Sequence, residues 1–103
     1  MNVITNICLV PIGVGVSLSK YVALCERIFK KAGLNFHLHA NGTNVEGDWD
    51  EVFMAIKHCH EEVHALDVVR IHTTIQLGTR TDKKQTMKDK VNSVQANLPG
   101  DKK

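Results

Sequence analysis

The sequence lacks several features that whole classes of protein require. No apolar run approaches the roughly 18 residues that a membrane-spanning helix needs, and the apolar N-terminal stretch MNVITNICLVPIGVG has no basic segment of the kind that opens a secretory signal. The cysteines, Cys8, Cys25 and Cys59, are odd in number and form no Cys-x-x-Cys spacing, which excludes a disulfide framework and a thiolate zinc site. We therefore expect a soluble cytoplasmic protein whose cysteines are reduced core residues.

Aromatic residues and excess charge are also scarce. Phe, Trp and Tyr make up 5% of the residues, and the predicted strands lack the exposed aromatic rings on which RNA-binding sheets stack bases. Lys and Arg total 13 against 11 Asp and Glu, and the formal charge of +2 is too small to indicate a nucleic-acid-binding surface. A length of 103 residues, with 43% hydrophobic content, suits one compact domain covering residues 1–103.

The hydrophobic periodicity changes several times along the chain and predicts the order of its elements. An alternating strand over residues 3–12 ends at Pro11 and Gly13, and a helix capped by Ser17 or Ser19 runs to about Lys31. The remaining predicted elements are strands over residues 34–40 and 43–47, a helix over about 49–66, a strand over 68–77 and a helix over about 85–98, which Pro99-Gly100 should stop. Asn41-Gly42 predicts a hairpin between the two short strands.

This order of elements predicts an α+β fold. Two strand-helix-strand halves joined by a hairpin indicate a ferredoxin-like βαββαβ sandwich, in which both helices cover one face of a four-stranded antiparallel sheet. The helix over about 85–98 is an addition at the C-terminal end. On the strands, alternation should bury Leu34, Phe36, Leu38, Val69, Ile71, Thr73, Ile75 and Leu77 under the helices.

The opposite face of the predicted sheet is polar. It should carry His37, His39, Arg70, His72 and Thr74, a set too polar for a core. Such a face can be solvated, line a ligand site or stack against the sheet of another subunit, and a small domain with one uncovered sheet face favours association.

The stretch His60-Glu61-Glu62-Val63-His64 matches the H-E-x-x-H pattern of zinc peptidases. Helical geometry places His60 within the apolar stripe of its helix and His64 at the border, whereas Glu61 faces solvent. The sequence offers no third ligand at an interpretable spacing. We therefore expect no metal site, and a partly buried His60 that is hydrogen-bonded beside the core.

The segment NGTNVEGDWDEV carries a more informative cluster. Thr43 and Glu46 lie on a short strand, and Trp49 opens the next helix, so that a hydroxyl, a carboxylate and an indole are available to hold a flat cationic ligand. The alternative interpretation is structural. Asp48 would then cap the helix, Trp49 would pack in the core and Glu46 would pair with Arg70 across the sheet.

The polar loop GTRTDKKQT follows the last predicted strand. Thr79, Arg80 and the neighbouring hydroxyls could receive an anion or another subunit, and the loop lacks the glycine run and the Gly-Lys-Ser/Thr of a P-loop. A solvated turn in which Thr81 or Asp82 caps the last helix is an equally good interpretation.

Four segments together resemble a known family. VPIGVGVSLSKYV, NGTNVEGDWDEV, VRIHTTIQLGTRTDK and DKVNSV are similar, in this order from about Cys8 to Val94, to the small thiamine-binding proteins related to the YkoF-type binders of thiamine and hydroxymethylpyrimidine. The resemblance implies a ferredoxin-like fold, a homotetramer formed by sheet pairing and stacking, and binding of thiamine or a related pyrimidine without catalysis or a cofactor.

The resemblance also implies a set of site residues. The ligand-binding positions fall on Ser17, Ser19, Thr43, Glu46, Trp49 and Arg70, to which the neighbouring His72 of the polar face is added; the loop contributes Thr79, Arg80 and Asp82. Two hypotheses follow. The first is a small-molecule binding protein that acts as carrier, buffer or sensor, and the second is an oligomeric interaction protein that keeps the fold without a ligand.

Overall fold

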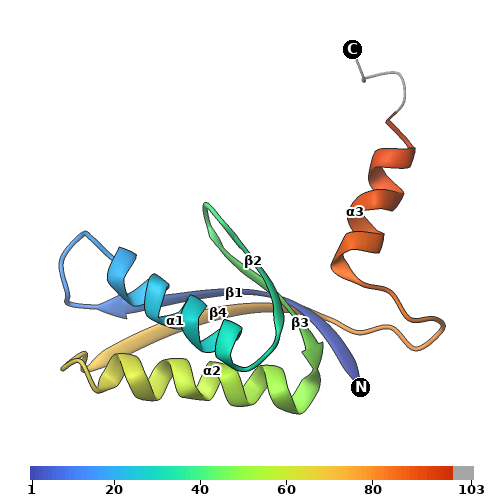
Figure 1. The fold of residues 1–103 in the computed structure, drawn as a ribbon. Helices are drawn as coiled ribbons and strands as arrows, with labels where there is room; N and C mark the ends of the chain where they lie inside the picture. The colour runs from blue at the N-terminus through green and yellow to red at the C-terminus, as the bar shows by residue number, and fades with distance from the viewer. Residues whose placement is uncertain (99–103) are drawn as a thin grey trace.

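The computed structural model describes residues 1–98, which form four strands and three helices in the predicted order. The elements are β1 (Asn2–Ile12), α1 (Ser19–Lys31), β2 (Asn35–His39), β3 (Gly42–Asp48), α2 (Trp49–His64), β4 (Arg70–Gly78) and α3 (Met87–Ala96). The strands make one antiparallel sheet in the order β2-β3-β1-β4, and α1 and α2 lie over one face of it (Figure 1). The predicted ferredoxin-like α+β sandwich with an extra C-terminal helix is therefore confirmed.

The core fills the space between the sheet and the two helices. On β1, Val3, Thr5 and Ile7 are buried at every second position, because alternate side chains of a strand point to opposite faces. Thr5 satisfies its hydroxyl by donating to the backbone carbonyl of Val45, at 2.8 Å. The other buried apolar residues are Tyr21, Cys25, Phe29, Leu34, Val45, Val52, Ala55, Ile56, Cys59, Val63 and Val68.

The start of α1 differs from the prediction. Leu18 occupies the N-cap and no side chain accepts a hydrogen bond there, so the expected cap by Ser17 or Ser19 is wrong. Ser19 is the first residue of the helix, and the carbonyl of Leu18 accepts from the backbone amides of Tyr21 and Val22. Tyr21, Cys25 and Phe29 are buried at helical spacing on the face that α1 turns to the core.

α2 begins as predicted. The carboxylate of Asp48 accepts from the amide of Asp50 at 3.1 Å and so caps the helix, which ends at His64, two residues before the predicted end at Leu66. The structural interpretation predicted that Trp49 packs in the core. Its side chain is instead 36% exposed and lies against the ring of Phe53, with 4.9 Å between the ring centroids.

The hairpin predicted at Asn41-Gly42 is present, and its register makes Ala40 and Asn41 the loop residues because His39 pairs with Gly42. The tip of the hairpin extends beyond the helices (Figure 1). Leu38, predicted to be buried, is 52% exposed at this tip.

Along β4 the burial of side chains alternates as predicted in the middle of the strand but not at its ends. Ile71 and Ile75 pack against the core, whereas Val69 precedes the strand and is 92% exposed and Leu77 is 38% exposed. Each helix-facing residue of β4 pairs with one of β1, such as Ile75 with Ile7.

His60 joins α2 to β4. Its Nε2 lies 2.7 Å from the hydroxyl of Thr73, and Nδ1 of His64 lies 2.6 Å from the carbonyl of Val68. The partly buried, hydrogen-bonded His60 is thus confirmed. Glu61 is exposed, and residues 1–98 contain no group of three side chains placed to hold a metal ion. The absence of bound zinc stays a prediction.

α3 is shorter than predicted and begins differently. Thr86 caps it by accepting from the amide of Asp89, whose carboxylate accepts from the amide of Thr86, so neither Thr81 nor Asp82 is the cap. The helix ends at Ala96, and the predicted stop at Pro99 and Gly100 lies outside the described residues. No helix among residues 1–98 is long and apolar enough to cross a membrane.

A methyl group at Gly42 should destabilise the fold. A Cβ there would lie 2.8 Å from the carbonyl oxygen of Ile7, a backbone atom that cannot rotate away. We expect Gly42→Ala to lower the free energy of unfolding by about 1 to 3 kcal/mol. Gly78→Ala is the matched control, because a Cβ there meets nothing within 4 Å. Equal urea midpoints for the two variants would contradict the prediction.

The environment of His60 predicts a pH-dependent stability. Burial, and then the nearby charge of His64, lowers the pKa of His60 below its ordinary value. The unfolded chain therefore binds more protons near pH 6, so stability rises with pH and falls as the pH drops through about 6.5. His60→Gln should reduce the fall in melting temperature between pH 7 and pH 5, measured by circular dichroism. His58→Gln, on an exposed position of the same helix, should leave it unchanged. Identical pH profiles for all three proteins would rule out His60 as the source.

Candidate binding cavity

A cavity of about 370 Å³ opens between α1, β1 and the β2–β3 hairpin. Its walls are mostly aliphatic and aromatic, and they include Ile7, Leu9, Val22, Phe29 and Ile56. The polar residues of the lining include Glu26, Asn41 and Thr43, and Cys25 and Cys59 add two thiols. Cys8 and His39 also border the cavity, but their side chains project from the opposite face of the sheet, where His39 contacts Asn6. An apolar hollow of this volume with a few polar groups is typical of a small-molecule site.

Glu26 is the chemically distinctive residue of the cavity. Its Oε2 accepts from the hydroxyl of Thr43 at 2.7 Å, while its Oε1 is buried and has no hydrogen-bond partner among the described residues. Thr43 is itself only 4% exposed. Buried carboxylate oxygens are almost always paired, because desolvation without a partner costs free energy. This oxygen is therefore free to accept a hydrogen bond from a group outside the described chain.

Two thiols lie together in the same lining. Cys25 and Cys59 are 6% and 1% exposed, from α1 and α2 respectively. Cys59 donates a hydrogen bond to Cys25, and this bond together with burial raises the pKa of the Cys59 thiol above its ordinary value. A thiol whose pKa is raised remains protonated and weakly reactive, as expected of a core cysteine.

The structure distributes the predicted ligand-binding residues over separate places. Thr43 alone lies in the lining of the cavity, and Ser17 and Ser19 are exposed on either side of Leu18, which does line it. Trp49 lies at the start of α2. The other three, Glu46, Arg70 and His72, project from the sheet face that α1 and α2 leave open, as the register of β1 with β3 and β4 shows.

Glu46 is buried on that open face and is fully engaged by its own chain. One carboxylate oxygen accepts from the side-chain amide of Asn35, and the other accepts from the backbone amide of Met87 at 2.9 Å. The alternative pairing with Arg70 is wrong. Glu46 pairs across from Ile4 and Arg70 across from Ile12, which at ~3.3 Å per strand residue places the two rungs about 26 Å apart.

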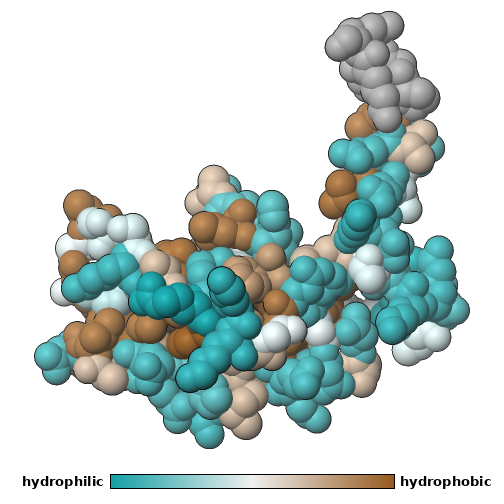
Figure 2. All heavy atoms as spheres, in the orientation of Figure 1, coloured by the Kyte–Doolittle hydropathy of each residue, from teal (hydrophilic) through white to brown (hydrophobic). Residues whose placement is uncertain are grey.

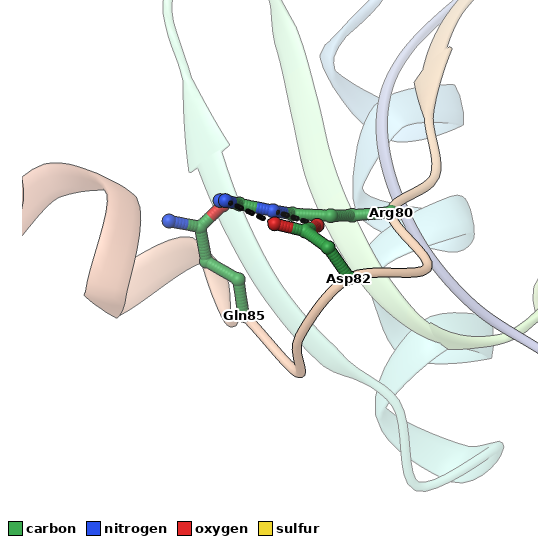
Figure 3. A network of polar contacts seen from close by, with 3 residues as sticks. All are labelled: Arg80, Asp82 and Gln85. Carbon is green, nitrogen blue, oxygen red and sulfur yellow. Dashed lines mark hydrogen bonds and ion pairs between the residues drawn. The ribbon is translucent and has the colours of Figure 1, made fainter.

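The polar loop GTRTDKKQT leads from β4 to α3, and the side chain of Arg80 makes hydrogen bonds within it. The Nη2 of Arg80 donates to Asp82 at 2.8 Å and Nη1 donates to Gln85 at 3.1 Å (Figure 3). The guanidinium lowers the pKa of Asp82 to about 2. Thr79 and Arg80 also line a hollow of about 210 Å³ with Lys83, Lys84 and Lys90. The suggested roles of this loop in binding an anion or a subunit stay predictions.

Glu26 was missed by the sequence prediction although the sequence contains a signal for it. The residue lies one position after Cys25 and three before Phe29, on the stripe that α1 turns toward the sheet. A charged residue within a buried stripe requires a partner, and the β3 strand supplies Thr43. Sequence alone does not show that these two residues meet, since they are far apart in the chain.

Comparison with known proteins identifies the family. A family model described as "Thiamine-binding protein" matches residues 5–95. A UPF0045 protein from Synechocystis is 58% identical over 95 residues, covering 92% of this chain and 78% of the relative, and one from Methanocaldococcus jannaschii is 36% identical over 93 residues, covering 90% and 92%.

Solved structures agree with the fold. That of the hypothetical protein MJ1052 from Methanocaldococcus jannaschii superposes with a TM-score of 0.84 at 35% identity, covering 91% of this chain and 96% of the other. A candidate thiamine biosynthesis/salvage protein from Thermotoga maritima has a TM-score of 0.78 at 17% identity, covering 91% and 99%, which supports the fold alone. The match over residues 5–95 and the similarity to UPF0045 relatives along most of the chain show that this protein belongs to the thiamine-binding protein family.

Proposed function

We propose that the protein binds thiamine or a related aminopyrimidine, such as hydroxymethylpyrimidine, in the cavity beside α1 and releases it unchanged. The observation that carries this proposal is the half-buried Glu26 carboxylate, whose buried Oε1 has no partner among the described residues in a mostly apolar lining. The family description supports the class of ligand and supports binding rather than catalysis. A cytoplasmic carrier, buffer or sensor fits this activity.

The chemistry of the cavity matches an aminopyrimidine. Such a ring is flat and largely apolar on its faces, which suits walls made by Ile7, Val22 and Phe29. Its exocyclic amine donates hydrogen bonds and its ring nitrogens become more basic beside a carboxylate, so Glu26 can accept from the ring and stabilise a protonated form. Thr43 fixes the carboxylate by donating to its other oxygen.

Removal of the Glu26 charge should weaken binding. Glu26→Gln preserves the size of the side chain, and the loss of a charge-assisted hydrogen bond worth roughly 1.5 to 3 kcal/mol should lower the affinity for thiamine or hydroxymethylpyrimidine about 10- to 100-fold. Isothermal titration calorimetry with thiamine, thiamine phosphate and hydroxymethylpyrimidine measures this change. The unliganded variant should melt no lower than the wild type, because a desolvated charge has been removed.

Glu46→Gln is the matched control, because this carboxylate is also buried but both of its oxygens are engaged within the chain. The affinity should stay within about twofold of the wild type. A loss of binding in Glu46→Gln, with normal binding in Glu26→Gln, would move the ligand to the open sheet face. If none of the three compounds binds the wild type, the hypothesis of an interaction protein without a ligand replaces this one.

We also propose that the chain assembles into a homotetramer, in which sheets pair at their edges and stack through their open faces. Within residues 1–98 no helix covers this face, and exposed side chains on it include His37, His72 and Thr74 beside Ile12, which is 44% exposed. Symmetric stacking would bury the face on each subunit. Light scattering at micromolar concentration should give a mass near four chains, and the mass of one chain would contradict the assembly.

A further inference from the structure

Two buried thiols from different helices meet in the wall of the cavity. Cys25 on α1 and Cys59 on α2 are 6% and 1% exposed, and Cys59 donates a hydrogen bond to Cys25. The third cysteine, Cys8, has its side chain on the opposite face of the sheet. The proposed binding of an aminopyrimidine uses neither thiol of the pair, so both are available for chemistry of their own.

The packing of α1 beside α2 brings the two cysteines close enough for a covalent bond. Both residues lie on the buried sides of their helices, which contact each other over the sheet (Figure 1). The axes of packed helices are about 8 to 10 Å apart and Cα atoms lie about 2.3 Å from each axis, which separates facing Cα atoms by about 3.5 to 5.5 Å. A disulfide joins Cα atoms that are about 4.4 to 6.8 Å apart, so it fits between facing positions of such helices.

The surroundings give the two thiols different roles. The hydrogen bond from Cys59 lowers the pKa of the Cys25 thiol, whereas burial and the charge of Glu26 act in the opposite direction. The same hydrogen bond and burial raise the pKa of Cys59. Because the thiolate is the nucleophilic form, Cys25 is the attacking group and Cys59 keeps its proton until a second step. Cys25 is also the more exposed of the two.

We propose that Cys25 and Cys59 form a reversible disulfide when hydrogen peroxide enters the cavity, and that this bond lowers the affinity of the cavity for its ligand. A hollow of about 370 Å³ has room for peroxide, because a water molecule occupies about 30 Å³ in the liquid. The disulfide is independent of any ligand, whereas its effect on affinity rests on the proposed function. Under reducing conditions the pair stays as thiols, which is the resting state that an oxidant sensor requires.

The reaction balances with peroxide as the oxidant. The Cys25 thiolate attacks one oxygen, the O–O bond breaks, and the leaving hydroxide takes up the proton that Cys25 released, so that water departs and a sulfenic acid remains on Cys25. The sulfur of Cys59 then attacks that of Cys25, the S–O bond breaks, and the departing oxygen takes the Cys59 proton. Two thiols are thereby oxidised to one disulfide, and one peroxide is reduced to two waters.

The disulfide should alter the wall of the cavity beside Glu26. The S–S bond is about 2.05 Å long, so it draws together two sulfurs that otherwise meet only through a hydrogen bond. Glu26 follows Cys25 on the same turn of α1, and its hydrogen bond with Thr43 depends on the position of that turn. We therefore expect the oxidised protein to bind hydroxymethylpyrimidine or thiamine at least about threefold more weakly, because a charge-assisted hydrogen bond to the ligand is misaligned.

Counting thiols tests the disulfide. Reduced wild-type protein at micromolar concentration is treated with hydrogen peroxide, unfolded, alkylated with N-ethylmaleimide and analysed by mass spectrometry. We expect alkylation of Cys8 alone and a peptide linkage between positions 25 and 59, both reversed by dithiothreitol. Cys8→Ser is the matched control and should form the same linkage. Alkylation of all the cysteines, Cys8, Cys25 and Cys59, or a linkage that includes position 8, would overturn the proposal.

Single variants assign the two roles. In Cys59→Ser the sulfenic acid on Cys25 cannot be resolved, so dimedone should label position 25 after peroxide treatment. Cys25→Ser should show no dimedone at position 59, because that thiol keeps its proton. Equal labelling of the two variants would contradict the assigned order of attack. Circular dichroism checks the fold of each variant, and the wild-type thiol count decides the disulfide if a variant does not fold.

Calorimetry with hydroxymethylpyrimidine and thiamine tests the effect on binding. Peroxide should weaken binding to the wild type, dithiothreitol should restore it, and Cys25→Ser/Cys59→Ser should not respond to peroxide whatever its own affinity. An unchanged affinity in protein that carries the disulfide would refute the regulation and leave the disulfide standing. If neither compound binds the reduced wild type, the proposed function fails together with the regulation, whereas the thiol count still decides the disulfide.

Discussion

The central strand β1 is the constraint on which both sides of this molecule depend. It pairs with β3 from Asn2 to Ile7 and with β4 from Ile4 to Ile12, so its register fixes the whole sheet. Because side chains alternate along a strand, a slip of one residue would exchange the helix-facing set for the open-face set. The same strand therefore supplies Ile7 and Leu9 to the cavity, and Ile4 and Val10 to the open face.

Two carboxylates on opposite faces of the sheet differ in how their oxygens are satisfied. Glu46, on the open face, has both oxygens satisfied by Asn35 and the amide of Met87, so its charge holds α3 to the sheet. Glu26, on α1, has one oxygen that accepts from Thr43 and the other without a partner among the described residues. Removal of a carboxylate from water costs several kcal/mol unless hydrogen bonds compensate for it. A fold retains such an incomplete group most readily where a ligand completes it.

α3 is attached to the sandwich without packing against it. A helix that is capped at its start and attached only at its foot adds little to the stability of its own subunit, because it buries no side chain there. The hydrophobic side chains along α3, drawn in brown in Figure 2, and the open face of the sheet would each expose hydrophobic area to water if the chain remained alone. Surfaces of this kind on small domains generally mark sites of association. The architecture thus separates the cavity, on the helix side of the sheet, from the contacts available for assembly.

The sequence by itself determined the order of the elements, the hairpin and the cap of α2, because these follow from local spacing and from the chemistry of residues such as Asp48 and Gly42. Residue similarity also identified the family. Only the tertiary structure decided which polar residues meet. It placed Glu46 about 26 Å from Arg70 along the sheet and brought Glu26 to Thr43, because contacts between distant segments depend on the strand order and register. Periodicity assigns a residue to a face of its own element, but it cannot state which residue of another element lies opposite.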